Sequence, residues 1–232
     1  MSTSSGLQRR TGRADTRNRI LICGLGLFNE EGVAKISTNR IASDLGISPG
    51  NLYHHFKNKE QIAEWLVRRF DERIAAITSS AGAVVALDDL WLTLHLMFET
   101  VDEYRFVYRD IDQLMRRSHK IADRVRRITA RKLQAVRQMC HRLADAAVIQ
   151  AGPDDVDSLA LQMVFTTTYW LAFTKLLPQD PAGSVDAGHA AYQVLTLLTP
   201  YLEPAAQVYL TYLRSKYVGV AAHVRDKAEH RV

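Results

Sequence analysis

Hydrophobic positions in the first third of the chain recur every three to four residues, the spacing of one helical face. The pattern predicts a helix over about 16–32, a second over 38–45 and a third that begins at Pro49. A fourth helix opens near Asn58, where an asparagine followed three residues later by glutamine resembles a capping box. Its apolar face consists of Ile62, Leu66, Phe70, Ile74 and Ile77.

The same helical period continues to the end of the chain. Breaks rich in glycine, proline or small residues interrupt it near 81–82, 118, 151–153, 178–183 and 200–204. Alternating runs of β-branched residues, which would indicate strands, are nearly absent. The sequence therefore predicts an all-α fold.

The second and third helices are short and are joined by a tight turn at Gly46, the arrangement of a helix-turn-helix. In that motif the second helix lies in the major groove of DNA. The residues at or near its outer side are the candidate DNA contacts: Ser48, Pro49, Gly50, Asn51, Tyr53, His54 and His55. We expect a flexible basic arm at 1–14, a three-helix DNA-binding domain at 15–62 and a larger helical domain at 63–232.

The charge distribution supports a polyanionic partner. The net charge is +5, with a pI near 9.3. Residues 1–60 hold nine lysines and arginines against five acids, so +4 of the excess lies in this quarter of the chain. The arginines of the arm are either minor-groove or phosphate contacts, or part of a solvated tail.

Residues 16–66 resemble the DNA-binding domain of the TetR family of bacterial transcriptional regulators. The resemblance rests on Ile20-x7-Phe28-x3-Gly32, Thr38-x2-Ile41-Ala42-x3-Gly46-Ile47-Ser48 and Asn51-Leu52-Tyr53-x-His55-Phe56-x2-Lys59. It implies phosphate contacts by Thr38, Tyr53, His55 and Lys59, and places Pro49, Gly50 and Asn51 near base edges. The alternatives are that Tyr53 packs in the domain and that Lys59 and His54 are merely solvated.

The resemblance also implies a function. It predicts a homodimeric, sequence-specific transcriptional regulator, a repressor, that binds a palindromic operator on double-stranded DNA and is released by a small-molecule effector. No cofactor or metal is implied. The alternative is a non-specific DNA-coating protein that uses the basic arm and a basic helix, and its binding would fall steeply with salt.

Two helices near the C-terminus, over 155–177 and 185–199, are apolar on more than one side. Such helices are buried, and a four-helix bundle between two subunits would bury them. The predicted dimer interface consists of Leu159, Met163, Thr166, Trp170, Phe173, Tyr192 and Leu195. The alternative is that these side chains form the core of a single chain.

A ligand pocket is expected between the fourth helix and the helices of 87–142. Its candidate residues are Trp91, His95, Phe98, Phe106 and Tyr108, although most of these side chains could equally fill core. The segment 116–142 holds ten lysines and arginines and one acid, Asp123. This segment has three possible roles: pairing with the acids of 99–112, recognition of an anionic effector, or direct contact with DNA.

Other classes of function have weak support in the sequence. No apolar run approaches the length of a membrane helix and no secretory signal is present, so we expect a cytoplasmic protein. Cys23 and Cys140 have no metal-ligand spacing. The remaining candidates for a metal site or a catalytic group are His95, His119, His141 and His189. Their spacing matches no known metal or catalytic motif, so we expect that the protein is not an enzyme.

Overall fold

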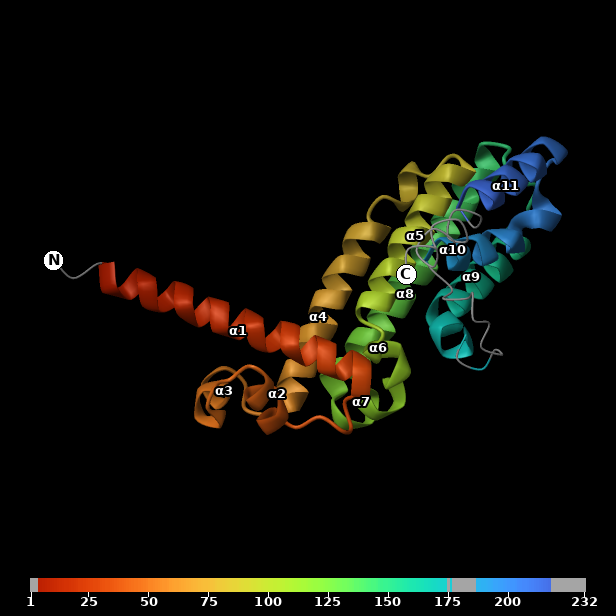
Figure 1. Cartoon of the computed structure of the whole chain (residues 1–232). Helices are drawn as coiled ribbons and strands as arrows, with labels where there is room; N and C mark the ends of the chain where they lie inside the picture. Colours follow the sequence, from red (N-terminus) through yellow and green to blue (C-terminus); the bar gives the residue numbers. More distant parts are fainter. Residues whose placement is uncertain (1–3, 175, 177–186, 218–232) are drawn as a thin grey trace, which may run out of the picture. The chain divides into compact units, whose positions relative to one another are not determined.

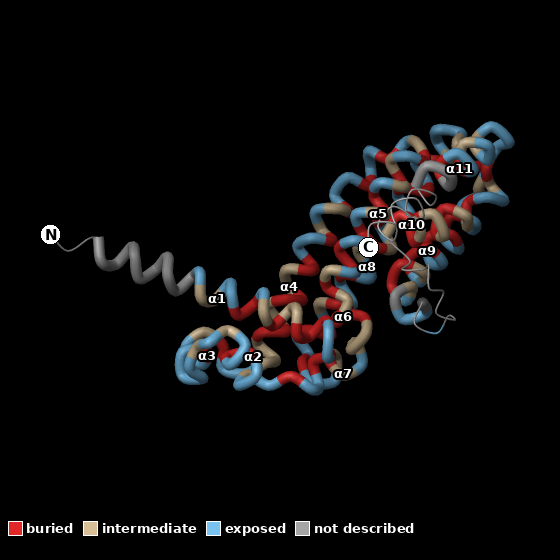
Figure 2. The backbone as a smooth tube through the Cα atoms, in the orientation of Figure 1, coloured by how far each residue is buried: buried red, intermediate tan, exposed pale blue. Residues whose placement is uncertain are grey.

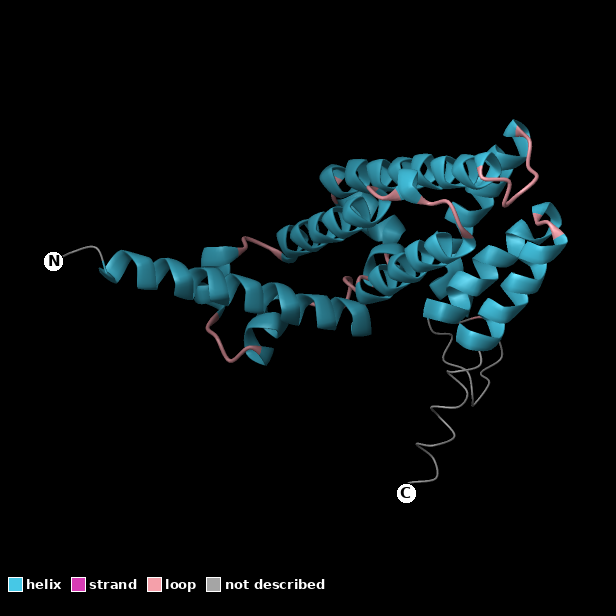
Figure 3. Cartoon of the chain, turned by 90° about the horizontal axis from the view of Figure 1, so that it is seen from above, coloured by secondary structure: helices cyan, strands magenta, loops and turns pink. Residues whose placement is uncertain are grey.

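The computed structural model describes residues 4–174, 176 and 187–217, and this part of the chain is built from helices (Figures 1 and 3). The α-helices are α1 (Ser4–Glu31), α2 (Thr38–Asp44), α3 (Pro49–His55), α4 (Lys59–Thr78), α5 (Leu87–Glu103), α6 (Phe106–Arg109), α7 (Ile111–Arg117), α8 (His119–Asp145), α9 (Pro153–Thr174), α10 (Ala187–Leu195) and α11 (Pro204–Tyr217), with 3-10 turns η1 (Ala81–Ala83) and η2 (Thr196–Tyr201). The predicted all-α class is confirmed. The break predicted at 178–183 lies outside the described residues.

The ends of the N-terminal helices are fixed by the residues that the sequence marks for this purpose. The side chain of Ser48 accepts a hydrogen bond from the N–H of Asn51 at 3.2 Å and caps α3. Asn58 accepts from the N–H of Gln61 at 2.9 Å and caps α4. Gly46 has φ +64°, a conformation that a side chain would strain, and it makes the turn between α2 and α3.

The first helix is longer than predicted. The sequence indicated a flexible arm at 1–14 because this segment lacks apolar spacing. From Ser4 onward it is instead part of α1, which continues without a break to Glu31. The backbone hydrogen bonds of a helix do not require an apolar face. Hydrophobic periodicity alone therefore could not predict that α1 begins at Ser4.

The chain divides into two compact units, and the division differs from the predicted boundary after residue 62. The first unit comprises Met1–Asp71 and Tyr104–Val125. The second comprises Glu72–Glu103 and Arg126–Val232. Each unit is therefore made from two stretches of sequence, and both α4 and α8 pass from one unit into the other.

The first unit has buried apolar side chains on each of its main helices (Figure 2). Phe28 of α1, Phe56 after α3, and Phe70 of α4 are each at most 1% exposed. Phe106 packs on Phe28 with ring centroids 5.6 Å apart, and Tyr108 meets Phe70 edge-on at 5.6 Å. Aromatic pairs in these geometries add to the stabilisation from burial.

The second unit has its own core, formed by α5, α8, α9, α10 and α11. Its buried apolar side chains include Leu94, Met139, Met163 and Val194. Among the described residues no helix is both long and apolar enough to cross a membrane.

Candidate nucleic-acid interface

Helices α2 and α3 bury one side and expose the other. Ile41, Ala42 and Leu52 are at most 1% exposed and join this motif to the core of the first unit. At the turn, the N–H of Ile47 donates to the carbonyl of Ala42 at 3.0 Å, which closes the end of α2. The predicted helix-turn-helix geometry is therefore present.

The outer side of α3 is open to solvent. Ser48, Pro49, Gly50, Asn51, Tyr53 and His54 are exposed, and His55 is half-buried. Exposed polar side chains on a short helix that follows a tight turn are in position to meet base edges. Their roles in DNA contact remain predictions.

Thr38 and Tyr53 come together although they are 15 residues apart. The Thr38 Oγ1 and Tyr53 OH atoms are 3.2 Å apart and form a hydrogen bond at the surface, at the start of α2 and within α3. The ring of Tyr53 is half exposed, so it is not a core aromatic. Two neighbouring hydroxyls can donate to one phosphate, and this pair agrees with the predicted phosphate contacts.

Gly50 leaves open space above the first turn of α3. A Cβ added there would have only the Ser48 Oγ within 4 Å, at 4.0 Å. The fold itself therefore does not require glycine at this position. This fits the prediction that a base edge or the DNA backbone approaches here.

Lys59 is where the structure disagrees with the predicted phosphate contact. Its Nζ donates to the carbonyls of Val33 at 2.8 Å, Ala34 at 3.1 Å and Ile36 at 2.9 Å. An ammonium has three N–H donors, so all of them are engaged. Desolvation by burial lowers the pKa of Lys59, with a smaller opposing effect of Glu60. Lys59 therefore holds the loop before α2, and its side chain is not a phosphate donor in this structure.

A second set of hydrogen bonds holds the same loop, and nothing in the sequence pattern predicted it. The N–H of Val33 donates to Asp110 Oδ2 at 2.8 Å, and Arg109 donates through Nη1 to the carbonyl of Asn29 at 2.7 Å. The N–H of Phe106 donates to Asn29 Oδ1 at 3.1 Å. The helix α6 thus fixes the end of α1, and the loop that carries α2 starts from a rigid point.

The predicted pocket residues are divided between the two units. Phe106 and Tyr108 are buried among the aromatic side chains of the first unit, which agrees with the alternative that they fill core, and their role in a ligand pocket stays a prediction. Trp91, His95 and Phe98 lie on α5 of the second unit. Trp91 stacks on His95 with ring centroids 4.8 Å apart, and Phe98 is 2% exposed.

The predicted dimer residues also separate by exposure. Leu159, Met163 and Leu195 are at most 2% exposed in the core of their own chain, so they are not on a surface that a second chain can contact. Thr166, Trp170 and Tyr192 are half-buried, and Phe173 is half exposed. For the three buried residues the structure agrees with the alternative of intrachain core, and the other four stay predictions. The sequence could not separate the two groups, because α9 is apolar on two sides and periodicity does not say which side faces the core. The exposed stripe consists of Leu161, Phe165, Tyr169, Phe173 and Leu176.

Comparisons with known proteins agree with this architecture. Residues 20–66 match the family described as bacterial regulatory proteins, tetR family, and residues 69–210 match the family described as bacterial transcriptional repressor (TetR). An HTH-type transcriptional regulator of Staphylococcus aureus is 47% identical over 55 residues, which are 24% of this chain and 30% of that protein. The chain therefore matches only about a third of the length of that curated relative.

Solved structures extend the similarity to most of the chain. A TetR-family transcriptional regulator from Marinobacter aquaeolei is 34% identical, with a TM-score of 0.78 and coverage of 87% of this chain and 98% of that one. AibR, solved in complex with isovaleryl coenzyme A and operator DNA, shares the fold with a TM-score of 0.62 at 16% identity, covering 80% of this chain and 99% of that one. With the helix-turn-helix in place and both family matches in order, the chain belongs to the TetR family of transcriptional regulators.

Proposed function

We propose that the chain is a homodimeric, sequence-specific repressor that binds a palindromic operator and releases it when a small molecule binds the second unit. The observation that carries the proposal is the surface pair Thr38–Tyr53 beside the exposed start of α3. Hydroxyls of this kind position a protein on phosphates, while Asn51 on the same exposed helix can pair with adenine. One short recognition helix reads few bases, so two copies on a two-fold axis are needed for specificity.

The apolar stripe on α9 supports the dimer. Phe165 is 63% exposed and Leu161 is 61% exposed, and within α9 the stripe repeats every four residues from Leu161 to Phe173 along one helical face. Contiguous apolar surface of this kind marks interaction sites in soluble proteins. A second copy of α9 packed against it would bury it in an isologous interface.

Two buried nitrogen atoms in the second unit support the effector site. The Nδ1 of His95 and the Nε1 of Trp170 are buried and have no hydrogen-bond partner in the described structure. Native proteins pair nearly all such atoms, so each of the two is a point at which a polar group of a bound molecule could be accepted or could accept. Trp170 lies 6.4 Å from His189 between ring centroids, so α9 and α10 both contribute to this region.

The effector would act by shifting populations of conformations. A ligand that prefers the state with misplaced recognition helices weakens DNA binding by its differential affinity for the two states. The helix α4 is continuous from Lys59 to Thr78 and belongs to both units, so it is the element through which we expect the shift to pass.

The test is fluorescence anisotropy on the DNA upstream of the chain's own gene and on a shuffled duplex, at about 50 and 200 mM salt. We expect preference for the native duplex at the higher salt. The variant Tyr53→Phe should bind the operator about fivefold more weakly per half-site, because one phosphate hydrogen bond of about 1 kcal/mol is lost. Asn51→Ala should instead relax sequence preference.

The matched control is Tyr201→Phe, which removes a tyrosine hydroxyl from the second unit, where it lies 3.3 Å from Asp155. It should bind DNA as the wild type does. Equal binding of both duplexes that collapses with salt would overturn sequence-specific binding in favour of non-specific DNA coating. Wild-type affinity of Tyr53→Phe would overturn the docking of the Thr38–Tyr53 pair on phosphate.

A further inference from the structure

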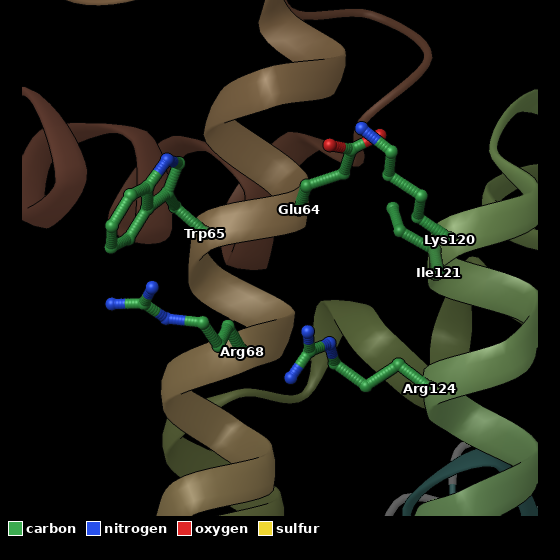
Figure 4. Close-up of a pocket in the computed structure, with 6 residues that line it drawn as sticks. All are labelled: Glu64, Trp65, Arg68, Lys120, Ile121 and Arg124. Atoms are coloured by element: carbon green, nitrogen blue, oxygen red, sulfur yellow. The ribbon is translucent and has the colours of Figure 1, made fainter.

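A cavity of about 190 Å³ lies between α4 and α8 within the first unit (Figure 4). It is many times larger than the space that one water molecule needs. Three cations and one carboxylate line it, together with one aromatic and one aliphatic side chain: Glu64, Trp65, Arg68, Lys120, Ile121 and Arg124. Lys120 and Arg124 extend from α8 toward α4.

Glu64, which lines the cavity, and Asp71, which contacts the lining residue Arg124, already have partners. Glu64 accepts a hydrogen bond from the hydroxyl of Ser118 at 2.7 Å, and Asp71 pairs with Arg124 at 3.1 Å. The guanidinium of Arg124 has five N–H donors, so the contact with Asp71 leaves others for a ligand. The ammonium of Lys120 has no hydrogen bond or ion pair in the described part of the chain.

Trp65 and the guanidinium of Arg68 extend from α4 away from Lys120 and Arg124 (Figure 4), and the indole of Trp65 holds two guanidinium groups. The guanidinium of Arg68 lies 3.6 Å from the ring centroid of Trp65, and that of Arg17 lies 3.7 Å from it. Two guanidinium groups at these distances cannot share one face of the indole, so they cover both faces. Desolvation lowers the pKa of Arg17, and the charges of Arg68 and Arg69 lower it further.

The balance of charge around the cavity is positive. Arg68, Lys120 and Arg124 line the cavity against the single acid Glu64, and Asp71 pairs with Arg124, so three cations against two acids leave an excess of one. Like charges held together destabilise a fold unless a counter-charge binds. A phosphate monoester carries close to two negative charges at pH 7 and offers three acceptor oxygens. Arginine and lysine are the side chains that bind phosphate most often.

We propose that the cavity between α4 and α8 binds the phosphate group of a small organic phosphate, held by Lys120 and Arg124. Glu64, which also lines the cavity, can accept a hydrogen bond from a hydroxyl of the ligand, so a hydroxylated phosphate ester fits better than inorganic phosphate. A DNA backbone fits less well, because the site is concave and a carboxylate lines it. The proposal does not rest on the proposed function, because binding of the phosphate ester is measured in the absence of DNA.

The test uses the full chain labelled with 5-fluorotryptophan. The chain has three tryptophans, so fluorine NMR gives three signals, and Trp65→Phe identifies the signal of Trp65. Glycerol phosphate is titrated at constant ionic strength maintained with chloride, with separate parallel titrations of inorganic phosphate, acetate and a DNA duplex. We expect a saturable shift of the Trp65 signal with an apparent Kd of about 1 mM or below for glycerol phosphate, and weaker binding of inorganic phosphate.

The diagnostic variant is Lys120→Gln, which changes an exposed side chain and leaves the ion pair of Arg124 intact. It should weaken glycerol phosphate binding about tenfold, because one charge-assisted hydrogen bond is lost. The matched control Lys35→Gln removes the same charge from an exposed position that does not line the cavity. Circular dichroism melting curves verify that both variants are folded.

Four results would overturn the proposal. One is the absence of a saturable Trp65 shift up to ~20 mM glycerol phosphate. Another is equal weakening by Lys120→Gln and Lys35→Gln, which would indicate a general charge effect. Acetate binding as tightly as the phosphates would show that the site selects carboxylates. A Trp65 shift that only duplex DNA produces would assign this surface to DNA.

Discussion

Replacing Lys132 by methionine tests whether this buried lysine weakens the second unit. Lys132 is 0% exposed, and its Nζ donates to Thr168 Oγ1 at 3.2 Å. Burial lowers the pKa of Lys132 from 10.5 to about 7. Methionine has a similar length and no charge. The hydroxyl of Thr168 stays satisfied in the variant, because it donates to the carbonyl of Val164 at 2.7 Å.

The magnitude follows from proton linkage. A pKa of about 7 in the folded chain against 10.5 in the unfolded chain corresponds to about 5 kcal/mol, an upper limit for the cost of holding Lys132 charged. Below pH 7 both states are protonated and the cost is fully present. Between pH 7 and 10.5 the unfolded chain binds a proton that the folded chain has released, so the stability of the wild type rises by about 1.4 kcal/mol per pH unit.

We therefore expect Lys132→Met to be about 1–4 kcal/mol more stable than the wild type at pH 7. From pH 7.5 to 9.5 the wild type should gain about 3 kcal/mol relative to the variant, which lacks this titration. The assay is guanidinium chloride unfolding at both pH values and at one fixed protein concentration, because dimers unfold in a concentration-dependent way. Lys35→Met, the same replacement at an exposed site, should retain the pH dependence of the wild type. If Lys132→Met is less stable than the wild type and has the same pH dependence, then Lys132 does not titrate as a desolvated lysine and the reasoning fails.

Three other predictions concern the DNA-binding motif and the dimer. Gly50→Ala should leave the thermal unfolding temperature nearly unchanged, because the added Cβ meets open space. It should weaken operator binding at least tenfold in anisotropy, and an unchanged affinity would contradict close approach of DNA to this position. Phe165→Glu should produce monomers at micromolar concentration in sedimentation analysis, whereas Leu92→Glu, which alters a side chain that is 52% exposed on α5, should stay dimeric. Lys59→Met should lower the free energy of unfolding by about 2–3 kcal/mol, because three backbone carbonyls lose a charged donor. If the variant instead loses DNA affinity without losing stability, Lys59 is a phosphate contact after all.

The helix boundaries around the DNA-binding motif could be predicted because they depend on local chemistry. Ser48 and Asn58 cap helices through bonds to N–H groups three residues ahead, and Gly46 adopts the positive φ that a turn needs. These interactions involve neighbours in sequence. The sequence alone is therefore sufficient to predict where these helices begin and end.

The partners of long side chains could not be predicted in the same way. The sequence identifies Lys59 as a cation at the start of a helix, where an anion is a reasonable partner. Its actual partners are carbonyls 23 to 26 residues earlier. Asp110 likewise meets Val33 across 77 residues. Such contacts depend on how the loop before α2 folds back, and neither periodicity nor capping rules determine that path.

The basic segment 116–142 illustrates why charge composition alone does not identify a function. The structure gives its cations four different environments on one stretch of helix. Arg124 pairs with Asp71 of α4, and Arg137 pairs with Asp157 of α9. Neither acid belongs to the segment 99–112, which the sequence suggested as the partner. Lys132 is buried beside Thr168, while Lys120 is exposed at the edge of a cavity. Because an exposed ion pair contributes little, Lys132 and Lys120 are the cations of this segment with consequences: the burial of Lys132 affects stability, and Lys120 is available to an anion.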